Sequence, residues 1–253
     1  LALEVISGYD HKDNTSSKKV VERYSDFEKK AKYKVVFLKE TLELKGLDIN
    51  IRKSMLGLIK DLKLKGHKVE TCSFPLLDYL VPTYYVLTTA EASSNLSRYD
   101  GIRYGHRSAS ARNLNETYIK SRSEGFGREV KRRIMLGTFV LSSEYKEAYY
   151  TKAQKIRSLI LKETNRILKN YDFIITPTTP RTAFEIDKDS QDPTEVYIED
   201  VFTVHANLTG KPAVSIPYGR SPKNLPFGLQ VLSQNFEEKK IYSFINQFLT
   251  HNI

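Results

Sequence analysis

Residues 33–38 read YKVVFL, a short run of β-branched and aromatic side chains that is typical of a strand buried on both faces. Residues 48–66 have apolar side chains spaced along one helical face, with Asp48 as N-cap and Gly66 as the stop. Residues 67–74 (HKVETCSF) predict a second strand. Strand, helix and strand within about 40 residues form a βαβ unit, which implies two parallel strands joined by a right-handed crossover.

The remainder of the chain predicts helices and three more strands. We expect strands at 172–180 (DFIITPTTP), 212–219 (PAVSIPYG) and 226–234 (PFGLQVLSQ). Apolar periodicity predicts further helices, at 83–99, 111–122, 127–141, 144–169, 193–210 and 236–249. A turn is expected at 75–80 and a loop with two glycines at 100–108. Because strands and helices occur along the whole length, the fold class is α/β.

The chain begins LALEVISGYD, without an initiator Met. Leu1, Val5 and Ile6 are spaced as the apolar face of a helix, and Gly8 is a natural stop. We expect the end of a helix here, with more chain before it. Residues 9–32 are polar and predict mostly loop with a short helix.

The composition is that of a water-soluble globular protein. The 253 residues are 40% hydrophobic and 28% charged, and no uncharged apolar run reaches the length of a membrane span. There is no signal-peptide pattern. The single cysteine, Cys72, excludes an intramolecular disulfide and fits a reducing compartment. The net charge of +10 suits nucleic acid or anionic surfaces, but the lysines are spread along the chain, which favours an ordinary solvated surface.

Motifs that carry chemistry by themselves are missing from the sequence. The five histidines are scattered, so no metal-ligand spacing occurs. No two glycines are adjacent, which excludes the usual phosphate-binding loops, and there is no G-x-S-x-G nucleophile motif. Serines such as Ser93 and Ser142 lie in predicted helices without an evident activating Lys or His, and we interpret them as packing residues.

Three adjacent cations stand out in the stretch EVKRRIMLG at 129–137. On a helix, Arg133 shares a face with Glu129 and Gly137. Gly137 removes a side chain one turn beyond Arg133, which leaves room for a ligand or for another backbone. From the pattern alone, Arg133 either pairs with Glu129 on a solvated surface or points inward at an anion.

Several stretches in matching order resemble the A subunit of the glutamyl-tRNA(Gln)/aspartyl-tRNA(Asn) amidotransferase, which belongs to the amidase-signature family. The most specific are AEASSNLSRYDGIRYG (90–105) and EGFGREVKRRIMLGT (124–138), and the likeness runs over nearly all of the chain. Lys211 departs from the pattern, because the family usually has an apolar residue there. The resemblance implies an amidase-signature fold, a mixed β-sheet flanked by helices, with residues 1–253 forming the C-terminal part of a single domain.

The resemblance covers only the C-terminal half of that subunit, so the fold is expected to be incomplete. The family's catalytic Lys, cis-Ser and nucleophilic Ser lie in the N-terminal half. No catalytic residue can therefore be carried over, and the chain alone is expected to be inactive. The glutamine-binding residues can be carried over, and they fall on Tyr84, Arg133 and Asp200.

The chemistry of these three side chains suits an α-amino acid. A guanidinium fork fits an α-carboxylate, a carboxylate fits an α-ammonium, and a tyrosine offers an oriented hydroxyl. For Tyr84 the alternative is a core tyrosine, and for Asp200 a surface acid.

The resemblance also implies a function and partners. The A subunit releases ammonia from glutamine, the B subunit uses ATP and Mg²⁺ to amidate Glu-tRNA(Gln) or Asp-tRNA(Asn), and a small C subunit clamps the two. We expect tRNA to be bound mainly by the B subunit, no cofactor in this chain, no membrane association and a cytoplasmic location. The alternatives are a stand-alone amidase of the same family, a non-catalytic remnant that only binds, and a basic RNA-binding module suggested by the charge.

Overall fold

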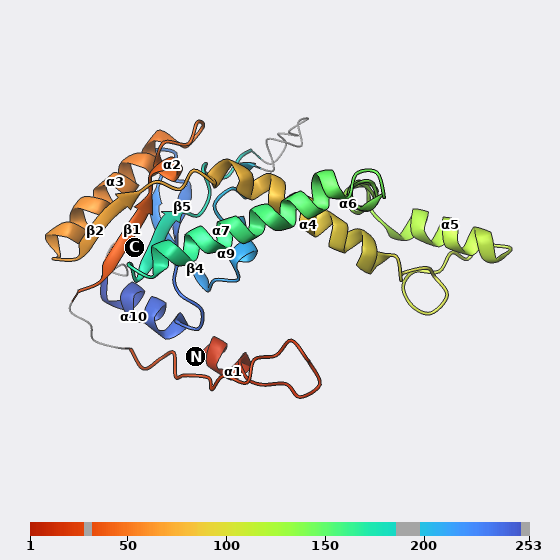
Figure 1. Ribbon diagram of the computed structural model, residues 1–253, viewed down its shortest axis with the longest axis horizontal. Helices are drawn as coiled ribbons and strands as arrows, with labels where there is room; N and C mark the ends of the chain where they lie inside the picture. Colours follow the sequence, from red (N-terminus) through yellow and green to blue (C-terminus); the bar gives the residue numbers. More distant parts are fainter. Residues whose placement is uncertain (28–31, 186–197, 249–253) are drawn as a thin grey trace. The chain divides into compact units, whose positions relative to one another are not determined.

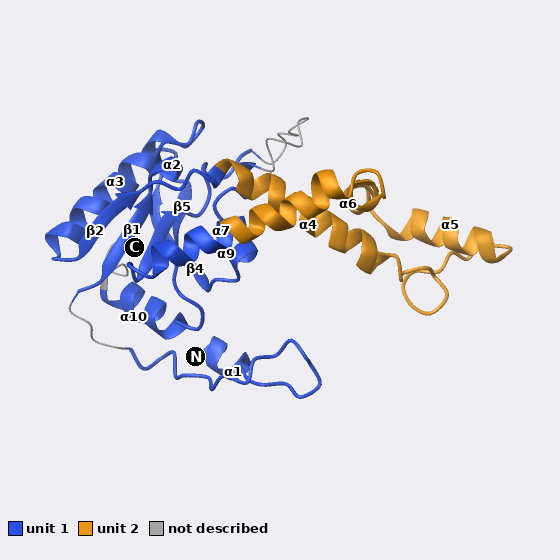
Figure 2. Cartoon of the chain, viewed as in Figure 1, with its two compact units in different colours: residues 1–77, 160–253 blue, residues 78–159 orange. Residues whose placement is uncertain are grey.

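The computed structural model describes residues 1–27, 32–185 and 198–248 (Figure 1). Contacts along the chain divide it into two compact units, residues 1–77 with 160–253 and residues 78–159 (Figure 2). The first, unit 1, contains the β-sheet, and the second, unit 2, is helical. Each is described by itself below.

The described part of unit 1 is built on a five-stranded sheet in the order β2-β1-β3-β5-β4. The strands are β1 (Lys34–Leu38), β2 (Lys68–Cys72), β3 (Phe173–Pro177), β4 (Ala213–Arg220) and β5 (Pro226–Leu232). β1 is parallel to β2 and to β3, with Val35 opposite Val69 on one side and Phe173 on the other. β5 is antiparallel to both β3 and β4. The sheet is therefore mixed, as predicted.

The βαβ unit predicted from residues 33–74 is confirmed. Helix α3 (Ile49–Leu64) connects β1 to β2, after the short helix α2 (Lys39–Leu42), which the sequence pattern did not predict. Asp48 caps α3 by accepting a hydrogen bond from the Asn50 N–H at 2.7 Å. Gly66 has φ +83, a left-handed conformation that suits glycine after the end of a helix.

The core of unit 1 lies between the sheet and its helices. Side chains of α3, the strands and α10 (Glu238–Phe248) form one buried cluster, in which Phe173 stacks on Phe244 at 4.6 Å between ring centroids. Tyr33, just before β1, also packs on both rings. The apolar periodicity of the last helix is thus explained by burial against the sheet.

Lys211, where the family pattern is usually apolar, is accommodated inside unit 1. It is 8% exposed, and its ammonium donates to Asn235 Oδ1 at 2.8 Å. Burial lowers the pKa of this amine. One polar partner at the end of a long aliphatic stem is enough to hold the lysine in a mostly apolar position.

Unit 2 contains α5 (Leu114–Gly125), α6 (Arg128–Leu141) and η1 (Glu147–Thr151), with most of α4 (Leu77–Leu96) and the first part of α7 (Lys152–Leu168). The predicted turn at 75–80 is wrong in its second half, because α4 begins at Leu77 and continues through Pro82. Pro82 lacks the N–H that would bond one turn back. Burial of Leu77, Leu80 and Tyr85 along this part of α4 offsets that loss.

Two other helix predictions differ from the structure. Residues 9–27 contain no helix, and residues 28–31 lie outside the described part. The predicted helix at 193–210 is described only from residue 198, where turns precede the short helix α9 (Val204–Thr209).

The short helix α1 (Ala2–Ile6) occurs where the sequence predicts a helix end, and Leu1, Val5 and Ile6 are exposed there.

Candidate functional site

The three cations at 131–133 on α6 divide between two partners. Lys131 donates to the Ser123 carbonyl oxygen at 2.6 Å. Arg132 and Arg133 both donate through Nε to the Glu129 carboxylate, each at 2.9 Å. These bonds, the one from Arg133 first, lower the pKa of Glu129. The pairing of Arg133 with Glu129 that the helical spacing predicts is therefore present.

Arg133 also has an aromatic neighbour. Its guanidinium carbon lies 5.6 Å from the centroid of the Tyr85 ring on α4, within the range of a cation–π contact. Its side chain is 39% exposed, so it lies at the edge of the helix pair, partly open to solvent. The side chain is thus held from two sides, by a carboxylate on its own helix and by a ring on the next.

Gly137 explains how α6 approaches α4 so closely. A Cβ at this position would lie 2.0 Å from the Thr89 carbonyl oxygen and 2.6 Å from Ser93 Cβ. The space that Gly137 leaves is therefore filled by a neighbouring backbone. Of the two explanations for this glycine, room for a ligand or room for another backbone, the second is correct. Tyr85, Thr89 and Ser93 follow one another at turns of α4 and meet successive parts of α6, since Ser93 Oγ lies 3.0 Å from Thr138 Oγ1.

Tyr84 is half-buried one residue before this contact line. Its ring meets the Tyr85 ring edge-on, at 5.4 Å between centroids. Only one of two adjacent tyrosines can face a ligand, and the family resemblance assigns that role to Tyr84. The contact between Tyr85 and Arg133 was not predicted from the sequence. No local sequence pattern marks that contact, because it depends on how α4 and α6 pack together.

Asp200 lies in unit 1, in the turns that precede α9, and is half-buried. Its carbonyl oxygen accepts hydrogen bonds from the Val204 N–H and from Thr203 Oγ1, both at 3.1 Å. The same turn is tied to the sheet by Gln230 of β5, whose side-chain amide donates to the Phe202 carbonyl oxygen at 3.0 Å. The backbone that carries Asp200 is thus fixed by buried polar contacts.

The structure describes the predicted glutamine-binding residues in two separate groups. Tyr84 and Arg133 belong to unit 2, where they lie on neighbouring helices that pack together. Asp200 belongs to unit 1. The assignment of these three residues to a single ligand therefore stays a prediction.

Helix α9, which follows Asp200, is anchored by a buried histidine. His205 is 2% exposed, packs on the Phe74 ring at 4.9 Å and lies 2.7 Å from Thr164 Oγ1. The Thr164 hydroxyl donates to the Ile160 carbonyl oxygen, so His205 Nε2 is the donor to Thr164. Burial lowers the pKa of His205 to about 4.

This buried imidazole predicts a loss of stability in weak acid. Because the folded-state pKa lies below the ordinary value, protonation favours unfolding, and stability falls as the pH drops from about 6.5 towards 4. At a pH of about 5 the loss from His205 is roughly 2 kcal/mol. Urea unfolding at neutral pH and near pH 5 measures it, and His205→Gln should flatten the difference. An unchanged pH dependence in His205→Gln would contradict this role.

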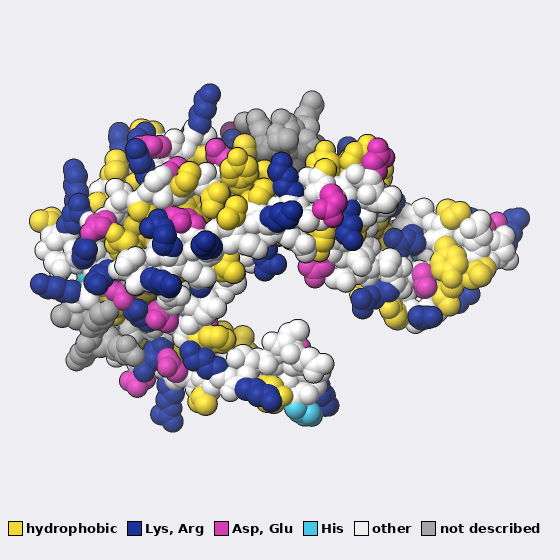
Figure 3. Space-filling view, viewed as in Figure 1, with side chains coloured by type: hydrophobic (Ala, Val, Ile, Leu, Met, Phe, Trp, Pro, Cys, Tyr) yellow, Lys and Arg dark blue, Asp and Glu magenta, His cyan; other side chains and the backbone are white. Residues whose placement is uncertain are grey.

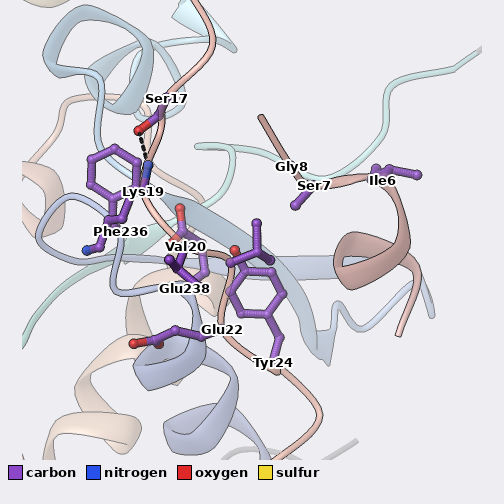
Figure 4. Close-up of a pocket in the computed structure, with 11 residues that line it drawn as sticks. Ile6, Ser7, Gly8, Ser17, Lys19, Val20, Glu22, Tyr24, Phe236 and Glu238 are labelled. Carbon is purple, nitrogen blue, oxygen red and sulfur yellow. Dashed lines mark hydrogen bonds between the residues drawn. The ribbon is translucent and has the colours of Figure 1, made fainter. Parts of the chain in front are cut away.

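A pocket of about 300 Å³ lies elsewhere in unit 1, between the N-terminal segment and the residues before α10 (Figure 4). Glu22, Tyr24, Phe236 and Glu238 help to line it, and the Lys19 ammonium lies 4.5 Å from the Phe236 ring centroid. None of the predicted glutamine-binding residues lines this pocket.

Over residues 1–27, 32–185 and 198–248, no group of three or more His, Cys, Asp or Glu is placed to hold a metal ion. No helix in the same ranges has the length and apolar character needed to cross a membrane.

Known proteins with high sequence similarity to this chain match it over almost its whole length. The family model described as Amidase matches residues 1–242. The chain is 46% identical over 244 residues to the glutamyl-tRNA(Gln) amidotransferase A subunit from Clostridium botulinum strain Okra, covering 96% of this chain and 50% of the relative. It is 45% identical over 240 residues to the protein of the same name from Brevibacillus brevis, covering 94% and 49%. The chain spans about half the length of these relatives.

Solved structures of similar proteins match the fold of this chain. The crystal structure of the glutamyl-tRNA(Gln) amidotransferase A subunit from Thermotoga maritima matches with a TM-score of 0.70 and 38% identity, over 95% of this chain and 47% of that one. A 6-aminohexanoate cyclic dimer hydrolase matches with a TM-score of 0.72 at 17% identity, over 97% of this chain and 51% of that one, which shows a shared fold alone. With its mixed sheet and its sequence similarity along almost the whole length, the chain belongs to the amidase family.

Proposed function

We propose that this chain is part of the glutamine-hydrolysing A subunit of a tRNA-dependent amidotransferase. In such an enzyme, ammonia released from glutamine converts Glu-tRNA(Gln) or Asp-tRNA(Asn) to Gln-tRNA(Gln) or Asn-tRNA(Asn). The observation that carries the proposal is the 46% identity over 96% of the chain to a protein named as that subunit. Similarity at this level, spread over both units, is far stronger than the fold likeness to other hydrolases.

Tyr84, Arg133 and Asp200 are proposed to bind the glutamine substrate. The planar guanidinium of Arg133 would bind the α-carboxylate, and Asp200 would bind the α-ammonium. Tyr84 would add an oriented hydroxyl beside an apolar ring. The pairing with Glu129 is the surface alternative for Arg133, and what supports the ligand role is the family resemblance together with a guanidinium that stays partly exposed beside Tyr85.

The remaining chemistry is proposed to come from outside this chain. The nucleophilic serine and its activating groups would lie in the other half of the A subunit, where an acyl-enzyme forms as ammonia leaves. The B subunit would bind ATP, Mg²⁺ and most of the tRNA, and the C subunit would join the other two. No cofactor is assigned to this chain, and the complex is expected in the cytoplasm.

Ammonia release from glutamine tests the proposal directly. The purified chain should show no turnover, and activity should appear when the missing half of the Clostridium botulinum relative is supplied together with it. Copurification with cognate subunits B and C should accompany that activity, whereas a stand-alone amidase would be active without them. Turnover by the chain alone, abolished by mutating one of its own serines, would show that the nucleophile has been misplaced.

Asp200 gives a more specific test of substrate binding. Asp200→Asn keeps the shape of the side chain and removes its charge. In the reconstituted glutaminase it should raise the KM for glutamine about tenfold or more, and should weaken an analogue that lacks the α-amino group much less. Steady-state kinetics with both substrates measures the difference. An equal loss for the two would assign Asp200 a structural role only.

A further inference from the structure

A buried amide on the sheet contacts the turn that carries Asp200. Gln230, on β5, is 5% exposed, and its Nε2 donates to the Phe202 carbonyl oxygen at 3.0 Å. The same nitrogen lies 3.4 Å from Oγ1 of Thr176, the residue opposite Gln230 on β3. The amide nitrogen, which carries two N–H groups, thus has two acceptors within unit 1.

The acceptor determines which way round the amide of Gln230 lies. A backbone carbonyl oxygen can only accept a hydrogen bond, so the side-chain nitrogen, and not the side-chain oxygen, faces Phe202. Phe202 is 1% exposed and its neighbour Val201 is 6% exposed. Because this part of the chain is enclosed, a Phe202 carbonyl that lost the Gln230 donor would have to turn to find another.

One turn of backbone connects this carbonyl to Asp200. We call residues 200–204 the Asp200 turn. The Asp200 carbonyl oxygen closes it by accepting from the Val204 N–H and from Thr203 Oγ1, both at 3.1 Å. Phe202 lies in the middle of the turn, so a rotation of its peptide shifts the ends of the turn relative to the sheet. The link from Gln230 to the Asp200 side chain therefore runs through the backbone.

A second side-chain contact next to Asp200 lies nearer the surface. Arg181 Nε donates to the Glu199 carboxylate at 2.6 Å, and the two side chains are 47% and 23% exposed. An ion pair that is open to solvent constrains the backbone weakly, whereas a buried donor to a carbonyl is costly to remove. Of these two contacts, that of Gln230 is the stronger constraint on the Asp200 turn.

The charge of the chain makes the position of the Asp200 carboxylate important. The net charge is +10, and Figure 3 shows Lys and Arg side chains spread over the visible face, with Asp and Glu among them. Such a field does not attract an ammonium, so the attraction must come from a carboxylate at short range. At an effective dielectric constant of about 20, moving a carboxylate from about 3 to about 4 Å from an ammonium weakens binding about tenfold.

We propose that Gln230 is a positioning residue for recognition of the α-ammonium of glutamine. Its buried amide holds the Phe202 carbonyl, and with it the Asp200 turn, where the Asp200 carboxylate reaches the ammonium. The inference rests on the proposed function, because Asp200 has this role only if glutamine is the substrate. It gives the polar face of β5 a part in substrate selection, while Leu229 and Val231 on its other face belong to the core.

The test compares two substrates of the reconstituted glutaminase, glutamine and 4-carbamoylbutanoate, which is glutamine without its α-amino group. Gln230→Met keeps the length of the side chain and removes both N–H donors. It should lower kcat/KM for glutamine relative to the analogue about three- to tenfold, mainly through the KM for glutamine. If the analogue reacts too slowly to measure, its inhibition constant against glutamine replaces its kcat/KM.

A loss of stability alone does not change this ratio, because both substrates meet the same folded fraction of the enzyme. Gln230→Asn, whose amide is one methylene shorter, should change the ratio in the same direction and serves if the Met variant does not fold. Added to Asp200→Asn, Gln230→Met should lower the ratio no further, because a positioning residue has no effect once the group that it positions is lost.

Thr41→Val is the matched control. Thr41, on α2 of unit 1, is 1% exposed, and its hydroxyl donates to the Leu38 carbonyl oxygen at 2.7 Å. The change therefore also removes a buried side-chain donor to a backbone carbonyl. It should leave the ratio between the two substrates within about twofold of the wild-type value.

Two results would overturn the inference while the proposed function stands. One is a wild-type ratio in the Gln230 variants, which would give Gln230 a structural role only. The other is a further fall of the same size when Gln230→Met is added to Asp200→Asn, which would show that Gln230 acts independently of Asp200. If the reconstituted wild type releases no ammonia from glutamine, the proposed function fails and this inference fails with it.

Discussion

Replacing Arg133 with Ala in the reconstituted glutaminase should raise the KM for glutamine roughly 10- to 150-fold. Hydrogen bonds to a charged group are worth about 1.5–3 kcal/mol each, and a guanidinium can give two of them to one carboxylate. The turnover number should change less than KM, because the α-carboxylate is remote from the amide that reacts. Steady-state kinetics of ammonia release measures both constants.

Three variants serve as controls for Arg133→Ala. Lys131→Ala should leave the KM nearly unchanged, because Lys131 donates to the Ser123 carbonyl oxygen. Arg132→Ala should also have a small effect, since Arg133 keeps its own bond to Glu129. Arg133→Lys should recover only part of the affinity, because an ammonium cannot bind a carboxylate with a planar fork. Equal effects at all three cations would show that the cluster acts only through its overall charge.

Replacing Gly137 with Ala should destabilise the protein by about 3 kcal/mol or more, which corresponds to a fall of roughly 6–12 °C in Tm. The added methyl group would lie 2.0 Å from the Thr89 carbonyl oxygen, and a backbone atom in the middle of α4 cannot move aside alone. The helices would have to separate, and the Tyr85–Arg133 contact would lengthen with them. Thermal and urea unfolding of the reconstituted glutaminase measure the loss.

Gly57→Ala provides the matched comparison. Gly57 lies inside α3 of unit 1, and nothing lies within 4 Å of a Cβ built there. Since Ala is favoured over Gly within a helix, this change should stabilise the protein by up to about 1 kcal/mol. If the Gly137 and Gly57 variants had the same stability, the close packing of α6 on α4 would not be present in solution.

The parts of the fold that follow from local periodicity could be predicted from the sequence. The βαβ unit at 33–74 could be predicted from a β-branched run, apolar side chains along one helical face, and residues that mark the ends of the helix. The start of α4 could not be predicted in this way, because Pro82 suggests a boundary and only burial along the helix shows that α4 passes through it. α2 was missed because four residues are too few to show a helical period.

The candidate site was less predictable than the fold. The pairing of Arg133 with Glu129 follows from helical spacing, but the Tyr85 contact depends on how two helices 40 or more residues apart in sequence pack together. Whether a ligand or another backbone lies beside Gly137 could also be decided only from the packing of these two helices. Tyr84 and Asp200 entered only through the family resemblance, since neither has a distinctive pattern around it.

The two contacts that hold Arg133 have a consequence for the entropy of ligand binding. An arginine that is free to sample its rotamers loses about 2 kcal/mol of conformational free energy when a ligand orders it. Here the Glu129 carboxylate at 2.9 Å and the Tyr85 ring at 5.6 Å already restrict the side chain. A carboxylate ligand that reaches this guanidinium therefore meets a side chain that became ordered when the protein folded, so binding costs less conformational entropy.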